Sequence, residues 1–259
     1  MNQLLNLKEI CKSYLVKSKS IKILQGINIS VERGRSLALV GESGSGKTTL
    51  ARIILGLTHP DSGIISWEND KKSLGVSAVF QNPWDAMNPR KLVWESIAEP
   101  FVISQNKEAS SFKEKAEEMA SEVGLSKNIL HCYPFELSGG QIQRAVIARA
   151  LILMPDLIIL DEPTSALDIS VQAQIINLLI HLQEKYNLTY IFISHDLQLV
   201  HYLVDTIVIL RNGKCLEQGF IENIFSNPKN QYLRSRIAHF PGYCVRFAMP
   251  AGLSRVFDH

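Results

Sequence analysis

The stretch that decides the fold is "SLALVGESGSGKTTLARIILGL" at residues 36–57. A short apolar run, "SLALV", comes before a glycine-rich loop, and the loop leads into a segment with apolar residues at helical spacing. Strand, glycine loop and helix in that order are the start of an α/β unit. We therefore predict an α/β fold in which this loop connects a strand to a helix.

The glycine loop, "GESGSGKT" at residues 41–48, fits the pattern G-x-x-x-x-G-K-[ST]. Its glycines allow the backbone to curl, so that successive N–H groups point inward at phosphate oxygens. Lys47 is expected to reach the outer phosphates, and the Thr48 hydroxyl to hold Mg²⁺. A purely structural glycine turn is the alternative, but the flanking strand and helix favour a nucleotide phosphate site. The predicted binding residues of the loop are Gly41, Glu42, Ser43, Gly44, Ser45, Gly46, Lys47, Thr48 and Thr49.

An acidic pair follows a second apolar run in "LIILDEPTSALD", residues 157–168. Two adjacent carboxylates at the end of a buried strand are unfavourable without a cation or a chemical task. Asp161 fits as a ligand of Mg²⁺, and Glu162 fits as the general base that orients an attacking water. The alternative is an N-cap run before the next helix, for which Asp168 is the best-placed cap.

Two further polar residues come at the ends of predicted strands. His195 follows "YIFIS", and Gln81 follows "VSAVF". A lone histidine is usually structural, but ligands gather at strand ends in α/β sheets, and this placement favours a catalytic role for His195. We expect Gln81 to act beside it as a ligand of the nucleotide and of Mg²⁺.

A second candidate phosphate loop lies in "FELSGGQIQR", residues 135–144. Helical spacing after Gly140 places the two glycines at a helix start, where free N–H groups and a partial positive charge suit an anion. A serine N-cap with a flexible turn is the alternative, and the segment alone does not decide between them.

Composition narrows the class of protein. Apolar residues make up 46% of the 259 residues and charged residues 20%, which is typical of a globular chain. A net charge of +2 does not indicate nucleic-acid binding. The four cysteines are scattered, which argues against a zinc site or disulfide framework and fits a reducing cytosol. No apolar run reaches the roughly 18 residues needed to span a bilayer, so a link to a membrane is expected to come through another protein.

The order of predicted elements indicates one large domain. Alternating strands at 4–10 and 23–31 form an antiparallel β subdomain, and α/β units follow. Residues 85–155 read as a helical insertion with charged outer faces. We place the domain at residues 1–226 and a short, weakly patterned tail at 227–259.

Taken together, these motifs resemble those of the ATP-binding-cassette (ABC) family over about residues 4–225. "GESGSGKT" is similar to its Walker A loop, "LIILDE" to its Walker B strand, "LSGGQ" at 137–141 to its signature and "SALD" at 165–168 to its D-loop. Gln81 matches the Q-loop and His195 the switch histidine. The resemblance implies a P-loop NTPase core that hydrolyses ATP with Mg²⁺.

The resemblance also offers a reason for two phosphate loops. In the family, two cassettes pack head to tail, and each ATP lies between the Walker A loop of one and the signature of the other. Tyr14 occupies the place where the family stacks an aromatic ring on adenine, although a core tyrosine is the alternative. The binding residues implied outside the first loop are Tyr14, Gln81, Ser138, Gly139, Gly140, Gln141 and Asp168.

The segment "FQNPWDAMNPRKLVWESIAEPF", residues 80–101, resembles importer ATPases for oligopeptides, dipeptides and nickel. This implies a subunit bound peripherally at the cytoplasmic face of the membrane. Its expected partners are a second ABC ATPase subunit, identical or related, two integral membrane permease subunits and, indirectly, an extracellular or periplasmic solute-binding protein. The tail lacks the H-P-Y-T motif of many peptide-type members, and Cys244 is its single cysteine, which argues against an iron–sulfur centre.

Two other hypotheses are weighed against an importer subunit. A soluble ABC ATPase acting on DNA or ribosomes usually carries two cassettes in one chain or a long coiled-coil insertion, and neither is visible here. A regulator that binds nucleotide without cleaving it is disfavoured by the presence of Lys47, Glu162 and His195 together. The cargo, peptide or nickel or another solute, stays open.

Overall fold

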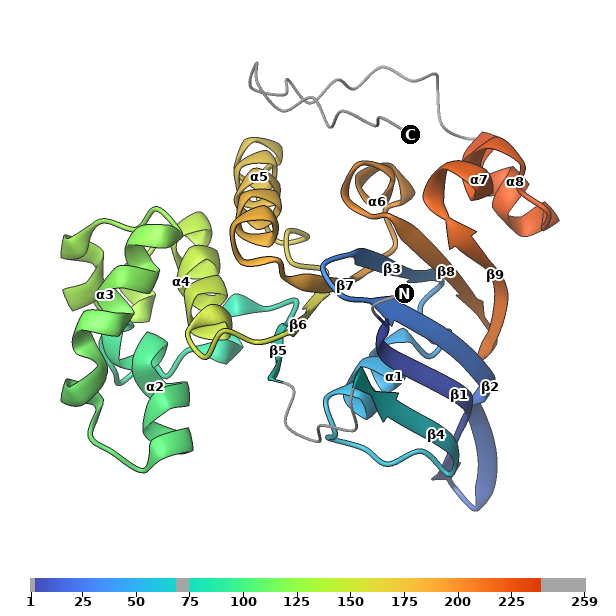
Figure 1. Cartoon of the computed structure of the whole chain (residues 1–259), viewed down its shortest axis with the longest axis horizontal. Coiled ribbons are helices and arrows are strands. Elements are labelled where there is room, and N and C mark those ends of the chain that lie inside the picture. Colours follow the sequence, from blue (N-terminus) through green and yellow to red (C-terminus); the bar gives the residue numbers. More distant parts are fainter. Residues whose placement is uncertain (1–2, 69–74, 239–259) are drawn as a thin grey trace.

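A computed structural model of the chain describes residues 3–68 and 75–238 (Figure 1). The predicted tail at 227–259 is therefore described as far as residue 238, and Cys244 lies outside the described residues.

The centre of the molecule is a sheet of six strands in the order β5-β6-β7-β3-β8-β9. Its strands are β3 (Ser36–Gly41), β5 (Val76–Val79), β6 (Leu157–Asp161), β7 (Thr189–Ser194), β8 (Thr206–Arg211) and β9 (Lys214–Phe220). All neighbours run parallel except β8 and β9, which form an antiparallel hairpin. The glycine loop follows β3, between β7 and β8, at the carboxyl edge where α/β sheets bind ligands.

A second sheet of three antiparallel strands makes up the predicted β subdomain, in the order β2-β1-β4. It consists of β1 (Gln3–Val16), β2 (Lys19–Glu32) and β4 (Ser62–Trp67). β1 and β2 are longer than predicted, because they continue as a hairpin through pairs such as Tyr14–Ile21 and Val16–Lys19. This extension is rich in lysine and serine, so it lacks the alternation of apolar and polar residues by which a strand is predicted.

The helices lie in two groups (Figure 1). α2 (Val93–Gln105), α3 (Lys113–Glu122) and α4 (Gly139–Leu151) form a lobe beside edge strand β5. The remaining helices are α1 (Lys47–Ile54), α5 (Ile169–Tyr186), α6 (Leu197–Leu203), α7 (Ile221–Ser226) and α8 (Gln231–Ala238). Short 3-10 turns occur at Pro83–Ala86, Ala109–Phe112, Lys127–His131 and Pro134–Glu136. The sequence did not predict α8, because the tail has little apolar periodicity.

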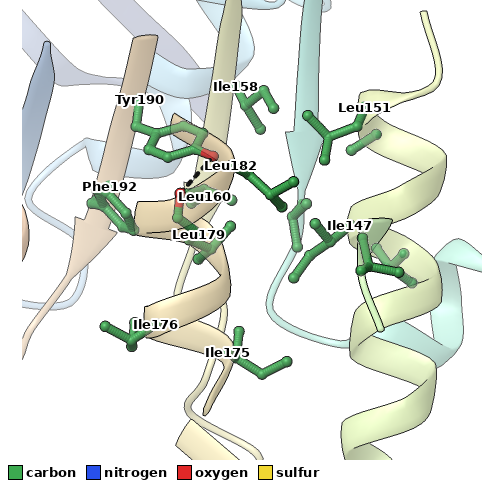
Figure 2. Packing of buried hydrophobic residues seen from close by; sticks show 14 of the residues in the cluster. Ile147, Leu151, Ile158, Leu160, Ile175, Ile176, Leu179, Leu182, Tyr190 and Phe192 are labelled. Carbon is green, nitrogen blue, oxygen red and sulfur yellow. Dashed lines mark hydrogen bonds between the residues drawn. The ribbon is translucent and has the colours of Figure 1, made fainter. Parts of the chain in front are cut away.

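The strands of the main sheet bury both faces. In β3, Ala38 and Val40 belong to a core shared with α4, α5 and α6, whereas Leu37 and Leu39 belong to a core shared with α1 and the second sheet. This alternation follows from the two-residue period of a strand. Figure 2 shows the first core, where the Tyr190 hydroxyl donates a hydrogen bond to the carbonyl of Leu179 at 3.1 Å. Both faces of the main sheet are therefore packed against other elements, which supports the strand ends.

Within the described residues, no helix combines the length and apolar character that crossing a membrane requires.

Candidate active site

The glycine loop between β3 and α1 is shaped by backbone that only glycine adopts easily. Gly44 and Gly46 have φ of 78° and 106°, in the left-handed region. A Cβ on Gly46 would lie 2.6 Å from Leu24 Cδ2 and 2.9 Å from the carbonyl oxygen of Ile23, both on β2. Around Gly44, by contrast, no atom of the described chain would lie within 4 Å of such a Cβ. The loop is therefore closed on the side of the second sheet and open around Gly44.

Lys47, at the start of α1, folds back over this loop. Its ammonium donates to the carbonyl oxygens of Gly41 at 2.8 Å and Glu42 at 2.9 Å. Burial lowers the pKa of Lys47, and attraction from Glu162 and Asp161 opposes that shift. The charge is thus held inside the loop before any ligand arrives.

The Ser45 side chain gives the loop a further polar group. Its hydroxyl oxygen is buried and finds no hydrogen-bond partner among the residues that the structure describes. A buried hydroxyl without a partner costs free energy unless a ligand satisfies it. Ser45, Lys47 and the open side at Gly44 therefore fit a phosphate group. Glu42, Ser43 and Thr48 are exposed, and Thr49 is half-buried.

Asp161 and Glu162 stand at the carboxyl end of β6, as the sequence predicts. The Asp161 carboxyl has a raised pKa because it is buried and because Glu162 lies beside it. Glu162 has φ of 48°, in the left-handed region, while its N–H donates to the carbonyl oxygen of Ile193 on β7 at 2.9 Å. Such a backbone costs about 1–2 kcal/mol for a residue with a side chain. Asp168 caps the helix that follows, as predicted, and neither Asp161 nor Glu162 takes part in that cap.

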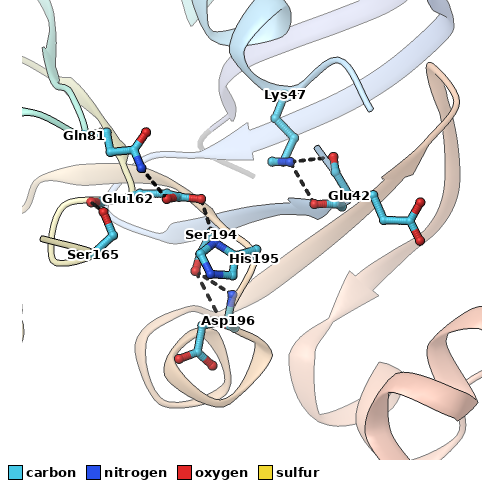
Figure 3. A network of polar contacts seen from close by, with 9 residues as sticks. Glu42, Lys47, Gln81, Glu162, Ser165, Ser194, His195 and Asp196 are labelled. Carbon is cyan, nitrogen blue, oxygen red and sulfur yellow. Dashed lines mark hydrogen bonds and ion pairs between the residues drawn. The ribbon is translucent and has the colours of Figure 1, made fainter. Parts of the chain in front are cut away.

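The Glu162 side chain is held between the two other predicted residues (Figure 3). Gln81 donates through Nε2 to Glu162 Oε2 at 3.0 Å, and His195 Nδ1 lies 2.7 Å from Glu162 Oε1. The His195 side chain is 66% exposed and that of Glu162 only 19%. Three residues from three neighbouring strand ends therefore meet in one network, with one carboxylate at its centre.

Two serines that the sequence analysis did not single out support this network. The Ser165 hydroxyl donates to the carbonyl oxygen of Glu162 at 3.2 Å. The hydroxyl of Ser194 accepts a hydrogen bond from the N–H of Asp196 at 3.0 Å and so shapes the turn that carries His195. Their closeness to the motif residues is the signal by which sequence reasoning could have found them.

Ser138 is the N-cap of α4, and this part of the structural alternative is confirmed. Its hydroxyl accepts from the N–H of Gln141 at 3.4 Å, while the Gln141 side chain accepts from the N–H of Ser138 at 2.9 Å. This reciprocal capping box satisfies both side chains within the segment. The first N–H groups of α4, at Gly139 and Gly140, have no acceptor within the helix itself.

The glycines of this segment also serve packing. A Cβ on Gly140 would lie 2.8 Å from Val171 Cγ1, and one on Gly139 would lie 3.3 Å from Leu167 Cδ2. The start of α4 is therefore pressed against the start of α5. There Asp168 accepts from the N–H of Val171 at 2.9 Å, which lowers the pKa of its carboxyl.

Tyr14 lies on β1 and is 38% exposed, so the interpretation as a core tyrosine is wrong. The structure thus gathers Lys47, Asp161, Glu162, Gln81 and His195 at the carboxyl edge of the main sheet. The capping box of α4 belongs to the helical lobe, and β5 and β6 lie between α4 and α1 (Figure 1).

Residues 24–165 match the sequence profile of the family described as "ABC transporter". The chain is 40% identical over 241 residues to the dipeptide transport ATP-binding protein DppF of Haemophilus influenzae, covering 89% of this chain and 74% of that protein. It is 39% identical over 257 residues to the oligopeptide transport ATP-binding protein AppF of Bacillus subtilis, covering 92% and 78%.

Solved structures are similar as well. The dimeric ATP-binding cassette MJ0796, in a post-hydrolysis state bound to ADP and Pi, aligns with a TM-score of 0.74 at 27% identity, over 84% of this chain and 99% of that chain. The ADP conformation of MJ1267, an ATP-binding cassette of an ABC transporter, aligns with a TM-score of 0.75 at 28% identity, over 91% and 99%.

Proposed function

Since the chain belongs to the ABC transporter family, we propose that it is the ATP-hydrolysing subunit of an importer that takes up peptides. It is an ABC-type ATPase, with ATP as its substrate. The relatives reported above are peptide-transport proteins, which supports peptides as the cargo. They support neither nickel nor a role on DNA or ribosomes.

The observation that carries the proposed chemistry is the position of Glu162 between Gln81 and His195. Its carboxylate accepts a proton from the water that attacks the γ-phosphorus, and the bond to the ADP oxygen breaks on the opposite side. His195 fixes one carboxylate oxygen, and Gln81 fixes the other. Lys47 stabilises the negative charge on the outer phosphates.

When bound, Mg²⁺ would supply positive charge that offsets the negative charge of the nucleotide phosphates. The residues that would hold it are Thr48, Gln81 and Asp161. The raised pKa of Asp161 supports this, because a buried carboxyl beside a second one gains a partner when a cation binds.

The second half of the site is proposed to come from another cassette. Ser138, Gly139, Gly140 and Gln141 would face the γ-phosphate held by the partner, with Asp168 at the same interface. In the capping box the Ser138 oxygen accepts a hydrogen bond, and its own hydrogen stays available for donation to a phosphate oxygen. A dimer with ADP and Pi among the similar structures supports this arrangement.

A groove of about 310 Å³ between β5, α2 and α4 is where we propose that a permease subunit docks. Ile103 is 74% exposed and Leu153 44%, so its rim is apolar. Inside, the Nε of Arg149 is buried without a partner in the described part of the chain, while its Nη2 donates to Glu99 at 2.9 Å. A helix that brings an apolar side chain and a carbonyl or carboxylate would satisfy both features.

These contacts would place the chain at the cytoplasmic face of the membrane, bound to two permease subunits. A solute-binding protein would act with it only through the permeases. The domain is proposed to span residues 1–226 with the helical insertion at 85–155, and 227–259 is a short tail that the structure describes only in part.

The test is Glu162→Gln in the assembled transporter. We expect ATP turnover to fall by roughly 10²–10⁴, the usual contribution of a general base, while ATP binding is kept. Glu184→Gln is the matched control, because Glu184 is exposed on α5 and its loss should leave turnover intact. Turnover near the wild-type rate in Glu162→Gln would remove Glu162 from this role.

A further inference from the structure

Tyr14 lies on the end of β1 that pairs with β2 but no longer with β4. β1 pairs with β2 as far as Val16–Lys19, but its pairing with β4 ends at Cys11–Ser62. A hairpin of two strands is marginally stable by itself in water. The position of the Tyr14 ring therefore depends on what holds the hairpin beyond Cys11.

Asp61, the residue before β4, holds this part of the hairpin in place. Its Oδ2 accepts from the N–H of Ser13 at 2.6 Å, and its Oδ1 accepts from the ammonium of Lys12 at 2.8 Å. Its own N–H donates to the carbonyl oxygen of Cys11 at 2.8 Å. Three hydrogen bonds thus continue the contact with β1 beyond the first residue of β4. They reach as far as Ser13, the residue before Tyr14. The Lys12 and Ser13 bonds hold the pKa of Asp61 below its usual range, so the carboxylate is charged at neutral pH.

Lys12 links this anchor to the ring itself. Residues two apart on a strand share a face, and the Lys12 ammonium lies 5.6 Å from the centroid of the Tyr14 ring. Tyr14 is nevertheless 38% exposed, which leaves ring surface for a flat ligand. Asp61 therefore fixes both the backbone beside Tyr14 and the cation over its ring.

The backbone next to Asp61 lies unusually close to β1. Gly63 has φ of 105°, and a Cβ there would lie 2.5 Å from the carbonyl oxygen of Glu9, where β1 bulges. Glu9 has φ of 51°. The chain that carries Asp61 is thus pressed against the bulge in β1, and its carboxylate reaches residues 12 and 13.

We propose that Asp61 is a positioning residue, which holds Lys12 and Ser13 so that the Tyr14 ring is presented to the adenine base. The proposal rests on the proposed function as an ATPase and on the adenine-stacking role that the family resemblance implies for Tyr14. Asp61 acts through Tyr14 and contributes no contact of its own to the nucleotide.

The experiment measures the affinity of the full chain for Mg-ADP and for Mg-pyrophosphate, which lacks the base. Tyr14→Ala should weaken ADP about tenfold, the usual scale of base–aromatic stacking. Asp61→Ala should weaken ADP about threefold to fivefold, since the ring remains but is less well held. Neither variant should change the affinity for pyrophosphate, which also shows that the phosphate loop is folded.

The double variant separates positioning from an independent effect. With Tyr14→Ala in place, Asp61→Ala should weaken ADP no further, because no ring is left to position. Asp61→Asn retains an acceptor for Ser13 and should give an intermediate loss. Glu118→Ala, which breaks the exposed pair with Lys115 and removes the same charge, should change nothing.

The outcomes distinguish the two proposals. If Tyr14→Ala leaves ADP binding unchanged, the adenine platform itself is wrong. If Tyr14→Ala weakens ADP but Asp61→Ala does not, only the positioning role is overturned. Equal loss of ADP and pyrophosphate in Asp61→Ala, or additive loss in the double variant, also overturns it.

Discussion

The two candidate phosphate sites of this chain differ in how complete they are. The glycine loop holds a buried cation, Lys47, and a buried hydroxyl, Ser45, that lacks a partner among the described residues. The capping box of α4 has its side chains already bonded to each other, and it offers backbone N–H groups at an exposed helix start. The first site therefore needs a ligand, whereas the second is stable without one. Binding should depend on the first site and completion of the reaction on the second.

The sharpest test of this contrast is the affinity of the isolated chain for ATP. Lys47→Met should weaken ATP by roughly 100-fold, because a charge-assisted bond to phosphate is lost from a buried position. Ser138→Ala should change that affinity by less than about twofold, since in the proposed dimer Ser138 faces the partner's nucleotide. Equilibrium titration of both variants checks this. Equal losses would mean that a single cassette uses both loops on one nucleotide.

In the assembled transporter, Ser138 should matter for ATP turnover, although it matters little for ATP affinity in the isolated chain. Ser138→Ala should lower ATP turnover about tenfold, because a hydrogen bond to the γ-phosphate is lost in the closed state. It also removes an N-cap, which costs about 1 kcal/mol of stability.

Asn230→Ala is the matched control for the cap. Asn230 accepts from the N–H of Tyr232 at 2.9 Å in the first turn of α8, far from the motifs in sequence. Its loss should cost similar stability and leave turnover intact. A similar fall in turnover in both variants would assign the effect of Ser138 to helix capping.

A third prediction concerns the packing of α4 on α5. Gly140→Ala should lower the free energy of unfolding by about 1–3 kcal/mol, because the new Cβ would lie 2.8 Å from Val171 Cγ1. Val171→Ala in the same chain should restore much of this loss by removing the clashing methyl group. Thermal unfolding measures both, and Gly139→Ala, with a 3.3 Å contact to Leu167, should be milder.

The smallest expected effect is electrostatic and concerns Asp161, on the side of the site that contains the glycine loop. Burial and Glu162 raise the pKa of Asp161 in the folded chain, so folding favours its protonated form. Its ionisation therefore destabilises the fold as pH rises through that raised pKa, and this cost is absent below the unfolded pKa. Asp161→Asn should raise the melting temperature of the nucleotide-free chain near pH 7, with a gain that disappears toward pH 4. A gain that is independent of pH would contradict this cause.

The sequence predicted the strands and helices around the motifs because those elements are strongly apolar and periodic. "SLALV", "LIIL" and "YIFIS" are buried strands, and helix α5 begins at the predicted cap, Asp168. The contact of Gln81 and His195 with Glu162 could be expected from their strand ends. The left-handed backbone of Glu162 and the bonds of Asp61 to residues 12 and 13 could not, because they depend on how distant segments meet. The hairpin extension and α8 were missed because they carry few buried residues.

The left-handed backbone of Glu162 bears on how such a chain evolves. Glycine at this position would relieve the strain, so a substitution that removes the general base of the proposed mechanism can also make the fold more stable. A lineage that no longer needs ATP hydrolysis should therefore lose this glutamate early and without harm to folding.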